Sequence, residues 1–590
     1  MGCRGGGIGG PLRVGASHGH LDRSARPGAV RRVSGVARCC SAPQQGATAR
    51  VLAVASRPPA PWCSRPAAGP GYGGPPSAAG CVAARGRGSE FRVFSWGLTM
   101  HVDVAVAGAG PAGLACARTL LNEQPGLRVL LLEAGRAYRR RPCPVDCGFH
   151  CTGCAGVCNV ISGFGGSMHY GDGAKLSQLP SGRRLTDHLG GLRADELCQQ
   201  AYGWLTGALT VPPVLVGQAV SPGAVAAFAA DGLALREYPV AVLSESGLRT
   251  VIESLHTELD GRAILWHGSE LTGAELDRAG MRLTVRNVAG VRQVTAGRLV
   301  LATGRRGVTA TTRLLDTLGI PSQPPDMSVG IRLEMPAPLL AAIGAEHPDV
   351  KVTQHLDGRQ KVKTFCFCGG PNGGRIKFTH YHDAFGPGGP VITLDGHETL
   401  ERHQPDGHRH LAANFGLLCQ ATGRGTPAAA LGSFLTGYRE LSGGRPLVQS
   451  LRAFLTRTDT PASWEEIRTR LSFDPSVADL VAGRVDRLFA DAEHAALATG
   501  FRRLMDSILR HSGTLLPDSG LDDILVIGPE LESLWATPPL DDGFQVPRGL
   551  PLHVTGDAAG IAQGIVQAAM TGIAAANAIT RTHTLAGATR

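Results

Sequence analysis

The stretch VDVAVAGAGPAGLACARTLL, residues 102–121, decides which fold the chain can adopt. Val102–Val106 is a short apolar run of the kind that forms a buried parallel strand. Small and apolar residues from Leu114 to Leu121 predict a helix, and Val129–Leu132 predicts a second strand that ends at Glu133. A Gly-x-Gly-x-x-Gly loop joins the first strand to the helix. This order of elements indicates a Rossmann-like dinucleotide-binding domain.

Each residue of this motif has a physical role in binding a dinucleotide. Gly108 permits the tight turn, Gly110 lets the backbone approach a pyrophosphate, and Gly113 lets the helix pack closely on the strand. The helix N-terminus offers free N–H groups and a positive dipole end to the phosphates. Glu133, about twenty residues after the last glycine, is expected to accept hydrogen bonds from the ribose hydroxyls.

Two later segments favour FAD as the dinucleotide. Arg298–Gly307, RLVLATGRRG, reads as an apolar strand ending in Ala-Thr-Gly, as in flavoproteins of the two-dinucleotide type. Pro551–Ile579 reads as a strand, a Gly-Asp turn and a long helix of small residues. In those flavoproteins the aspartate, here Asp557, binds the ribityl chain, and the helix N-terminus faces the flavin pyrimidine. Pro111 and Ala112 give the loop the form GAGPAGL, which is also more typical of FAD-binding proteins.

Over most of residues 100–585 the chain resembles a family of FAD-dependent oxidoreductases described as NAD(FAD)-utilising or FAD-dependent dehydrogenases. Besides the FAD elements, the resemblance rests on SGFGGSMHYGDGAKLS (Ser162–Ser177), VGIRLEMP (Val329–Pro336), KTFCFCGG (Lys363–Gly370), DGHE (Asp395–Glu398) and GDAAGIAQGIVQA (Gly556–Ala568). It implies a flavin redox enzyme but no particular substrate.

This chain departs from the family's pattern in the region expected to form the substrate pocket. His169 and Tyr170 stand where the family often has small residues, and Ala174 separates Asp172-Gly173 from Lys175-Leu176. The glycines of Gly163–Met168 allow the backbone to lie against a ligand, which is expected near the flavin. The predicted cofactor-binding residues are Gly108, Gly110, Pro111, Ala112, Gly113, Glu133, Ala134, Gly135, Gly165, Gly166, Ser167, Ala302, Thr303, Gly304, Gly556, Asp557, Gly564 and Ile565.

A flavin enzyme often needs a proton donor or acceptor near the flavin, and several polar residues are candidates. They are His169, Tyr170, Asp172, Lys175, Arg332 and Glu334. Each has a structural alternative: Asp172 is equally suited to capping a turn, and Arg332 and Glu334 to pairing with each other along a strand. The residues alone do not single out a catalytic group.

Five cysteines fall within sixteen residues, in the run CPVDCGFHCTGCAGVC between Cys143 and Cys158. The surrounding prolines and glycines predict a loop, placed between the ribose acid and the glycine-rich segment. Four interpretations remain open: an iron–sulfur cluster, a zinc site, redox thiols that exchange electrons with the flavin, or neither metal nor redox chemistry. The candidate metal ligands are Cys143, Cys147, Cys151, Cys154 and Cys158.

Two other patterns carry potential ligands at a spacing of two residues. In a regular strand, Cys366 and Cys368 share one face, where a direct disulfide would be strained, so packing is the expected role. His380 and His382 would also share a face, but no third metal ligand stands at a suitable spacing.

Charge is distributed unevenly along the 590 residues. The formal net charge is +10, but residues 1–99 hold 13 arginines and two acidic residues, so the remainder is close to neutral. A neutral body disfavours nucleic acid as a partner. No run of eighteen or more apolar residues occurs after residue 99, so no membrane span is expected.

The first 99 residues predict a disordered leader, rich in Gly, Pro, Ala, Ser and Arg. We expect that Met100 is the true start, which places the protein in the cytoplasm. The alternative is an organellar transit peptide.

The expected architecture is α/β. Residues 100–180, 240–320 and 548–585 would form a discontinuous Rossmann-like FAD-binding domain, with 181–239 and 321–547 as an inserted α+β substrate or cap domain. The expected function is hydride transfer between FAD and a small organic substrate, with NAD(P)H or another electron donor or acceptor as a further partner. The alternatives are a flavin-dependent monooxygenase or reductase, and a flavin-binding tRNA-modification or partner module.

Overall fold

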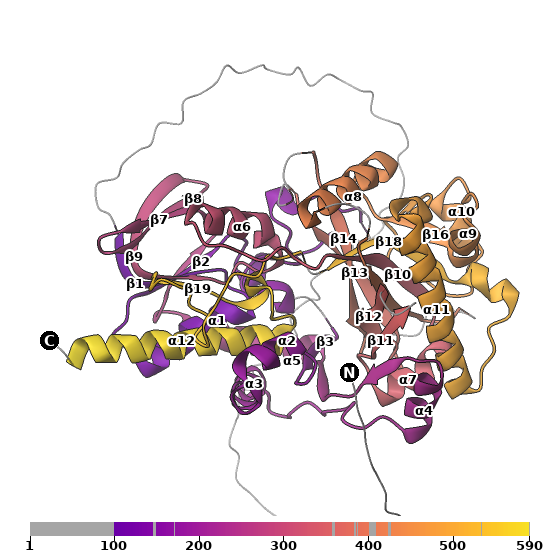
Figure 1. The fold of residues 1–590 in the computed structure, drawn as a ribbon, viewed down its shortest axis with the longest axis horizontal. Helices are drawn as coiled ribbons and strands as arrows, with labels where there is room; N and C mark the ends of the chain where they lie inside the picture. Colours follow the sequence, from indigo (N-terminus) through magenta and orange to yellow (C-terminus); the bar gives the residue numbers. More distant parts are fainter. Residues whose placement is uncertain are drawn as a thin grey trace, which may run out of the picture. The chain divides into compact units, whose positions relative to one another are not determined.

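The computed structural model describes most of the chain after the leader (Figure 1). The described residues are 100–588 without 146–148, 170–171, 357–359, 383–384, 386–387, 401–408, 423–425 and 533. The predictions about residues 1–99 fall outside them. In the part of the chain that is described, no helix combines the length and the apolar character needed to cross a bilayer.

The predicted strand–loop–helix–strand unit is confirmed. β1 (Met100–Ala107) and β2 (Val129–Glu133) form a parallel pair, joined by α1 (Pro111–Glu123). Alternate side chains of both strands enter two different apolar clusters, one on each face of the sheet. Burial on both faces explains why these strands are almost continuously apolar in sequence.

Two distant segments join β1 in the first sheet. β9 (Gly290–Leu301) runs parallel to β1 and pairs near its own end with β19 (Leu552–Val554), also in parallel. The main path through the first sheet is β6-β2-β1-β9-β8-β7. Its remaining strands are β6 (Ile264–His267), β7 (Glu270–Asp277) and β8 (Gly280–Asn287). The sheet therefore brings the chain after residues 107, 301 and 554 to one edge.

Helix α12 (Ile565–Ala588) runs alongside α1, as Figure 1 shows. Small residues allow a close approach, because a Cβ on Gly572 would lie only 2.0 Å from the carbonyl oxygen of Ala112. α3 (Gly191–Thr206) packs against α12, and its buried residues belong to the same apolar cluster. Part of the segment predicted as substrate or cap domain thus packs on the dinucleotide-binding elements, and the domain boundaries stay a prediction.

A second, mainly antiparallel sheet has the order β17-β16-β18-β10-β15-β12-β11-β4. Helix α11 (Asp491–Ser512) packs on β15 and β12. The strands are β4 (Ala234–Arg236), β10 (Ser328–Pro336), β11 (Lys351–Leu356), β12 (Gln360–Cys368), β15 (Ala412–Gln420), β16 (Leu447–Ser450), β17 (Val481–Ala482) and β18 (Leu525–Glu532).

Two small antiparallel sheets and several short helices complete the described fold. The small sheets are β3 (Ala174–Ser177) with β5 (Val240–Leu243), and β13 (Gly374–His380) with β14 (Ile392–Glu398). The other α-helices are α2 (Arg183–Leu189), α4 (Pro222–Ala230), α5 (Glu245–Leu259), α6 (Val308–Thr317), α7 (Ala341–Glu346), α8 (Pro427–Ser442), α9 (Leu451–Thr456) and α10 (Trp464–Thr469).

Gly113→Ala should destabilise the fold. The added Cβ would lie 1.8 Å from the carbonyl oxygen of Gly108, so α1 would have to move away from the loop. Overpacking of this kind costs about 1–3 kcal/mol, and thermal unfolding followed by circular dichroism should show a lower Tm. Gly126→Ala is the matched control, because a Cβ there meets nothing within 4 Å. Equal Tm values for the two variants would contradict the expectation.

Candidate functional site

The first glycine of the 108–113 loop is required by contacts within the protein. Gly108 has φ +114°, and a Cβ there would lie 2.1 Å from the carbonyl oxygen of Ala302. Gly108 is therefore strained for any other residue, on both conformational and steric grounds. The contact also places the Ala302–Gly304 turn, which follows β9, directly beside the loop.

Gly110 differs, because a Cβ there would meet only the Cα of Gly166, at an ordinary 3.8 Å. The N–H of Gly165 donates to the carbonyl oxygen of Ala109 at 2.8 Å, which fixes the glycine-rich segment against the loop. The 3₁₀ turn η4 (Gly166–His169) begins here, with Ser167 exposed between buried neighbours. Space at Gly110 is thus left free by the protein itself.

The Gly-Asp turn reaches the same point from the C-terminal end of the chain. Gly556 has φ +66°, and its N–H donates to Thr571 Oγ1 at 2.8 Å. A Cβ on Gly556 would lie 3.1 Å from the Cβ of Ala112. Four segments that are far apart in sequence therefore meet around the N-terminus of α1.

The N-terminus of α1 carries no side-chain cap from the described residues. Gly110, which has no side chain, stands at the N-cap position, and Pro111 stands at the first helical position. The first-turn N–H groups and the positive end of the helix dipole are the features that bind phosphate. This observation fits the dinucleotide prediction, as does the free space at Gly110.

Glu133 ties the surrounding segments together. The residue is 6% exposed, and its carboxylate accepts hydrogen bonds from the N–H groups of Ala109 at 2.8 Å, Gly135 at 2.7 Å and Gly163 at 2.9 Å. A ribose hydroxyl would be a further donor to this carboxylate, which has room for about four. The ribose contact stays a prediction, whereas the contribution of Glu133 to the loop is direct.

The other predicted cofactor residues lie at the ends of the same elements. Ala134 follows β2, Thr303 donates or accepts a 2.7 Å hydrogen bond with Thr311, and Gly564 precedes the first residue of α12, Ile565. The structure therefore gathers the residues predicted to bind the cofactor, although their contacts with it stay a prediction.

Asp557 lies in the 3₁₀ turn η9 (Gly556–Ala559), where its carboxylate is 3.9 Å from Nε of Arg305. Burial raises the pKa of Asp557 to about 6, and the nearby guanidinium only partly opposes this effect. The protein alone therefore holds an ionised Asp557 at a cost in stability. Such a cost is typical of a residue kept for a ligand rather than for the fold.

Asp557→Asn should stabilise the protein without FAD, and more at high pH. The folded-state pKa lies above the usual value of 3.8, so the folded state loses stability as pH rises from about 4 to about 6. At pH 8 the variant should gain about 3 kcal/mol of unfolding free energy, and less at pH 4.5. Urea unfolding at both pH values measures this difference. The control is Asp542→Asn, on the surface; equal effects of the two substitutions would contradict the prediction.

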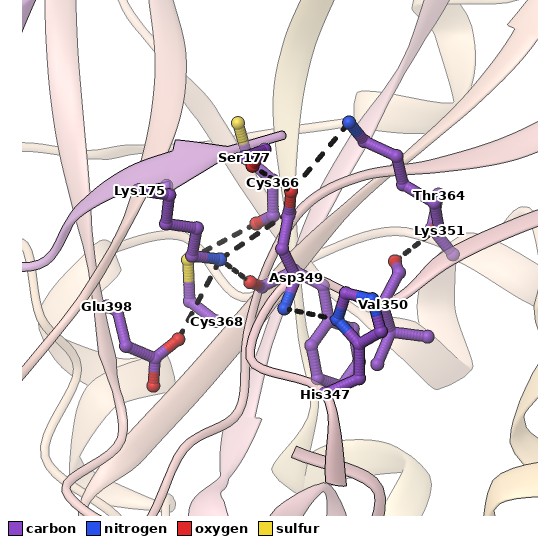
Figure 2. Close-up of polar contacts among 12 residues, drawn as sticks. Lys175, Ser177, His347, Asp349, Val350, Lys351, Thr364, Cys366, Cys368 and Glu398 are labelled. Atoms are coloured by element: carbon purple, nitrogen blue, oxygen red, sulfur yellow. Dashed lines mark hydrogen bonds and ion pairs between the residues drawn. The ribbon is translucent and has the colours of Figure 1, made fainter. Parts of the chain in front are cut away.

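Lys175, a candidate catalytic residue on β3, lies in a buried polar cluster (Figure 2). Its ammonium donates to the carbonyl oxygen of Phe367 and lies 3.6 Å from Asp349 Oδ1, 3.8 Å from Glu398 Oε2 and 3.5 Å from Cys368 Sγ. Asp349 in turn accepts hydrogen bonds from Ser177 and Tyr238. Lys175 is therefore held by two buried carboxylates, a carbonyl oxygen and a thiol.

Burial and the neighbouring groups shift the pKa values of the ionisable residues in this cluster. Burial alone would lower the pKa of Lys175, but its acidic neighbours reverse the effect and raise it. Burial raises the pKa of Cys368 to about 12, so this thiol is neutral at pH 7. Burial also raises the pKa of Glu398 to about 7, against the opposing effect of Lys175. Glu398 is consequently the group of the cluster that titrates near neutrality.

The other candidate catalytic residues near the glycine-rich segment are Asp172, His169 and Tyr170. Asp172 accepts a 2.6 Å hydrogen bond from the N–H of Leu400, which matches the alternative of a structural, turn-fixing role. His169 is the last residue of η4. Tyr170 lies outside the described residues.

Arg332 and Glu334, for which a mutual strand pair was the structural alternative, each have another partner in the structure. Arg332 is fully buried and makes a bidentate pair with Glu530, at 2.9 and 2.7 Å, across neighbouring strands. Glu334 instead accepts hydrogen bonds from the N–H and hydroxyl groups of Ser476. Residues two apart on one strand share a face. Arg332 nevertheless pairs with Glu530 on the neighbouring strand, because both carboxylate oxygens of Glu530 can accept hydrogen bonds from the guanidinium group.

The cysteine loop contacts β13. Cys151 Sγ lies 3.8 Å from His380 Nδ1, and Cys158 Sγ accepts from the N–H of His380 at 3.4 Å. Cys143 and Cys158 are buried in a small apolar cluster. No disulfide joins the described cysteines, and no group of three or more potential ligands among the described residues could hold a metal. Cys154 is half-buried, Cys147 falls in a gap of the description, and the iron–sulfur and zinc interpretations gain no support.

Two expectations of strand regularity are corrected. β12 has a bulge between Phe365 and Cys368, and Cys366 has φ +43°, so the two thiols do not follow a regular alternation. β13 ends at His380, and His382 has φ +49° with its ring stacked on that of His380 at 4.0 Å. Neither the bulge nor the end of the strand has a clear sign in the residue pattern.

The sequence did not single out the ion-pair partners Arg305, Asp349 and Asp395. Arg305 directly follows the Ala-Thr-Gly turn and pairs with Asp395 on β14 at 2.9 Å. Asp349 pairs with Lys175, which is far away in sequence. The available signal for Arg305 was its position after Gly304 in the predicted flavin site.

No protein-family model and no curated protein matches the chain. Among solved structures it is similar to formate oxidase from Aspergillus oryzae RIB40 (11% identity, 82% of this chain and 99% of that one, TM-score 0.40). It is also similar to pyridoxine 4-oxidase from Mesorbium loti (14%, 82% and 99%, 0.37). A third is OxyS anhydrotetracycline hydroxylase from Streptomyces rimosus (14%, 0.33), where 82% of this chain spans 63% of that protein. These proteins are two oxidases and a hydroxylase, one of them described for the modification of its FAD. The likeness is too distant to assign a family or a substrate.

Proposed function

We propose that this protein is an FAD-dependent oxidoreductase that transfers a hydride between bound FAD and a small organic substrate. The observation that carries the proposal is the meeting of four segments around the uncapped N-terminus of α1. They are the 108–113 loop, the glycine-rich segment, the turn after β9 and the Gly-Asp turn before α12. A site of this kind offers N–H groups and close backbone approach instead of charged side chains, which suits a pyrophosphate.

Within this proposal, the residues of the chain have distinct tasks. The first turn of α1 and Gly110 would hold the pyrophosphate, and Glu133 would lie at the adenosine ribose. Asp557 and the N-terminus of α12 would hold the ribityl chain and the pyrimidine end. FAD supplies the hydride chemistry when bound, and the protein supplies orientation and electrostatics.

The proposal also includes a catalytic group, an electron partner and a cellular compartment. Lys175 is the predicted catalytic candidate whose surroundings the structure describes most fully, and its partners keep it charged at neutral pH. We retain NAD(P)H or another small electron donor or acceptor as the second partner, and the cytoplasm as the compartment, as parts of the proposal.

Gly110→Ala should abolish or weaken FAD binding while the protein stays folded. Its Cβ would meet no atom of the described residues closer than 3.8 Å, and the backbone of Gly110 is extended, with φ −82°. The added methyl group would instead occupy the space of a ligand that contacts this backbone. We expect the affinity for FAD to fall at least about tenfold, or 1.4 kcal/mol. The flavin-to-protein ratio after gel filtration, and titration by flavin fluorescence, measure the loss.

The control for this experiment is Gly126→Ala, a methyl group added in open space. It should bind FAD as the unchanged protein does, and all three proteins should share one Tm without FAD. Failure of the unchanged full-length protein to bind FAD would overturn the proposed function. Unaltered binding by Gly110→Ala would show that the pyrophosphate does not lie at this loop.

A further inference from the structure

A chain of charged and polar side chains leads from the predicted flavin site to a thiol on the second sheet. Arg305 lies 3.9 Å from Asp557 and donates a 2.9 Å hydrogen bond to Oδ2 of Asp395. The other oxygen of Asp395 accepts from the Cys366 thiol at 3.3 Å. The four residues come from η9, η5 (Arg305–Gly307), β14 and β12. The chain thus links elements of the first sheet's carboxyl edge to β12.

The backbone turns the Cys366 thiol toward Asp395. Cys366 has φ +43° within the bulge of β12, a conformation that is strained for a non-glycine residue. In Figure 2 the sulfur of Cys368 lies beside the Lys175 ammonium, whereas the sulfur of Cys366 points away from it. The two thiols of KTFCFCGG therefore have different surroundings and are expected to have different roles.

The surroundings of Cys366 are partly open in a part of the molecule that is otherwise closed. The side chains of Arg305 and Asp557 are 24% and 20% exposed, and Cys366 is half-buried, whereas the neighbouring Arg332 is 0% exposed. These partly open groups lie where the predicted flavin site meets β12 and β14.

A buried donor without an acceptor borders this site. Asn414 is 0% exposed, and its Oδ1 accepts from Arg332, which also donates to the carbonyl oxygen of Cys366. Its Nδ2, however, has no hydrogen-bond partner among the described residues. A buried N–H without an acceptor is costly, and a ligand oxygen would satisfy it.

We propose that Cys366 transfers the proton that accompanies hydride transfer, and that Asp395 and Arg305 position its thiol at the flavin. This inference rests on the proposed function. Reduction of a substrate double bond needs one hydride and one proton. With the hydride supplied by reduced flavin, the S–H bond of Cys366 breaks and its proton bonds to the substrate. The thiolate then regains a proton from water, and the reverse sequence oxidises the substrate.

The electrostatic surroundings of Cys366 suit an acid that stays protonated until it reacts. Burial, and then Asp395, raise the pKa of Cys366 well above its usual value, while Arg332 on β10 opposes them. Asp349 and Cys368 also raise it. The charged side chains facing this region from other elements are Arg305 on η5 and Lys175 on β3.

An alkaline titration of the FAD-loaded full-length protein tests the proposal without a substrate. A thiolate in contact with oxidised flavin gives a broad charge-transfer absorption at longer wavelengths than the flavin's own bands. We expect this band to appear well above neutral pH, and to be lost in Cys366→Ser. Asp395→Asn should shift its appearance to lower pH by about one unit, because a negative neighbour is removed. Cys368→Ser is the matched control and should keep the band.

A second measurement uses the unchanged protein, so its result does not depend on whether any variant folds. Peptide mass spectrometry of the unchanged protein, after iodoacetamide treatment at alkaline pH where thiols ionise, should show that FAD protects Cys366, but not the half-buried Cys154. The inference is overturned if the protein binds FAD but shows neither band nor protection, or if Cys366→Ser keeps the band. Absence of FAD binding would instead overturn the proposed function itself, so the two failures are distinguishable.

Discussion

The arrangement of the dinucleotide-binding segments depends on one buried carboxylate. Glu133 accepts N–H groups from the glycine loop, from the turn after β2 and from the glycine-rich segment at the same time. Hydrogen bonds to an ionised acceptor are short and strong, and three of them repay the cost of burying its charge. Because the loop and the glycine-rich segment are both held by this group, their spacing is set before any ligand arrives.

The second organising feature is strand β12, which presents different chemistry on its two sides. One side meets the Lys175 cluster, where an ammonium and two carboxylates balance one another in a closed environment. The other side meets Asp395 and Arg305 in a more open one. The bulge in β12 separates the two environments, because it allows Cys366 and Cys368, two residues apart, to depart from regular alternation.

The parts of the fold that the sequence predicted well are those specified locally. The β1–α1–β2 unit has strong apolar periodicity and glycines with steric roles, so its elements were found to within a few residues. The Ala-Thr-Gly and Gly-Asp turns were predicted to lie beside this unit because they follow the order of elements in FAD-binding proteins. The contacts of Gly108 and Gly556 agree with that prediction.

Long-range polar pairing, in contrast, has no local signature. The partners Arg332 and Glu530 are 198 residues apart, and no periodicity connects them. The bulge at Cys366 and the stacked imidazoles of His380 and His382 depend on tertiary contacts, which override the alternation expected for a strand. The cysteine run was conspicuous in sequence, yet its described thiols contact β13 and apolar side chains without forming a group of metal ligands.

The close packing of α12 on α1 has a consequence for how the protein is made. A ribosome releases the glycine loop more than four hundred residues before it releases the helix that covers α1. Until then, the apolar face of α1 that α12 will bury, including Ala112 and Cys116, has no permanent partner. Nascent chains would therefore carry an exposed apolar helix face until α12 has been synthesised, which makes the appearance of α12 the step that completes this packing.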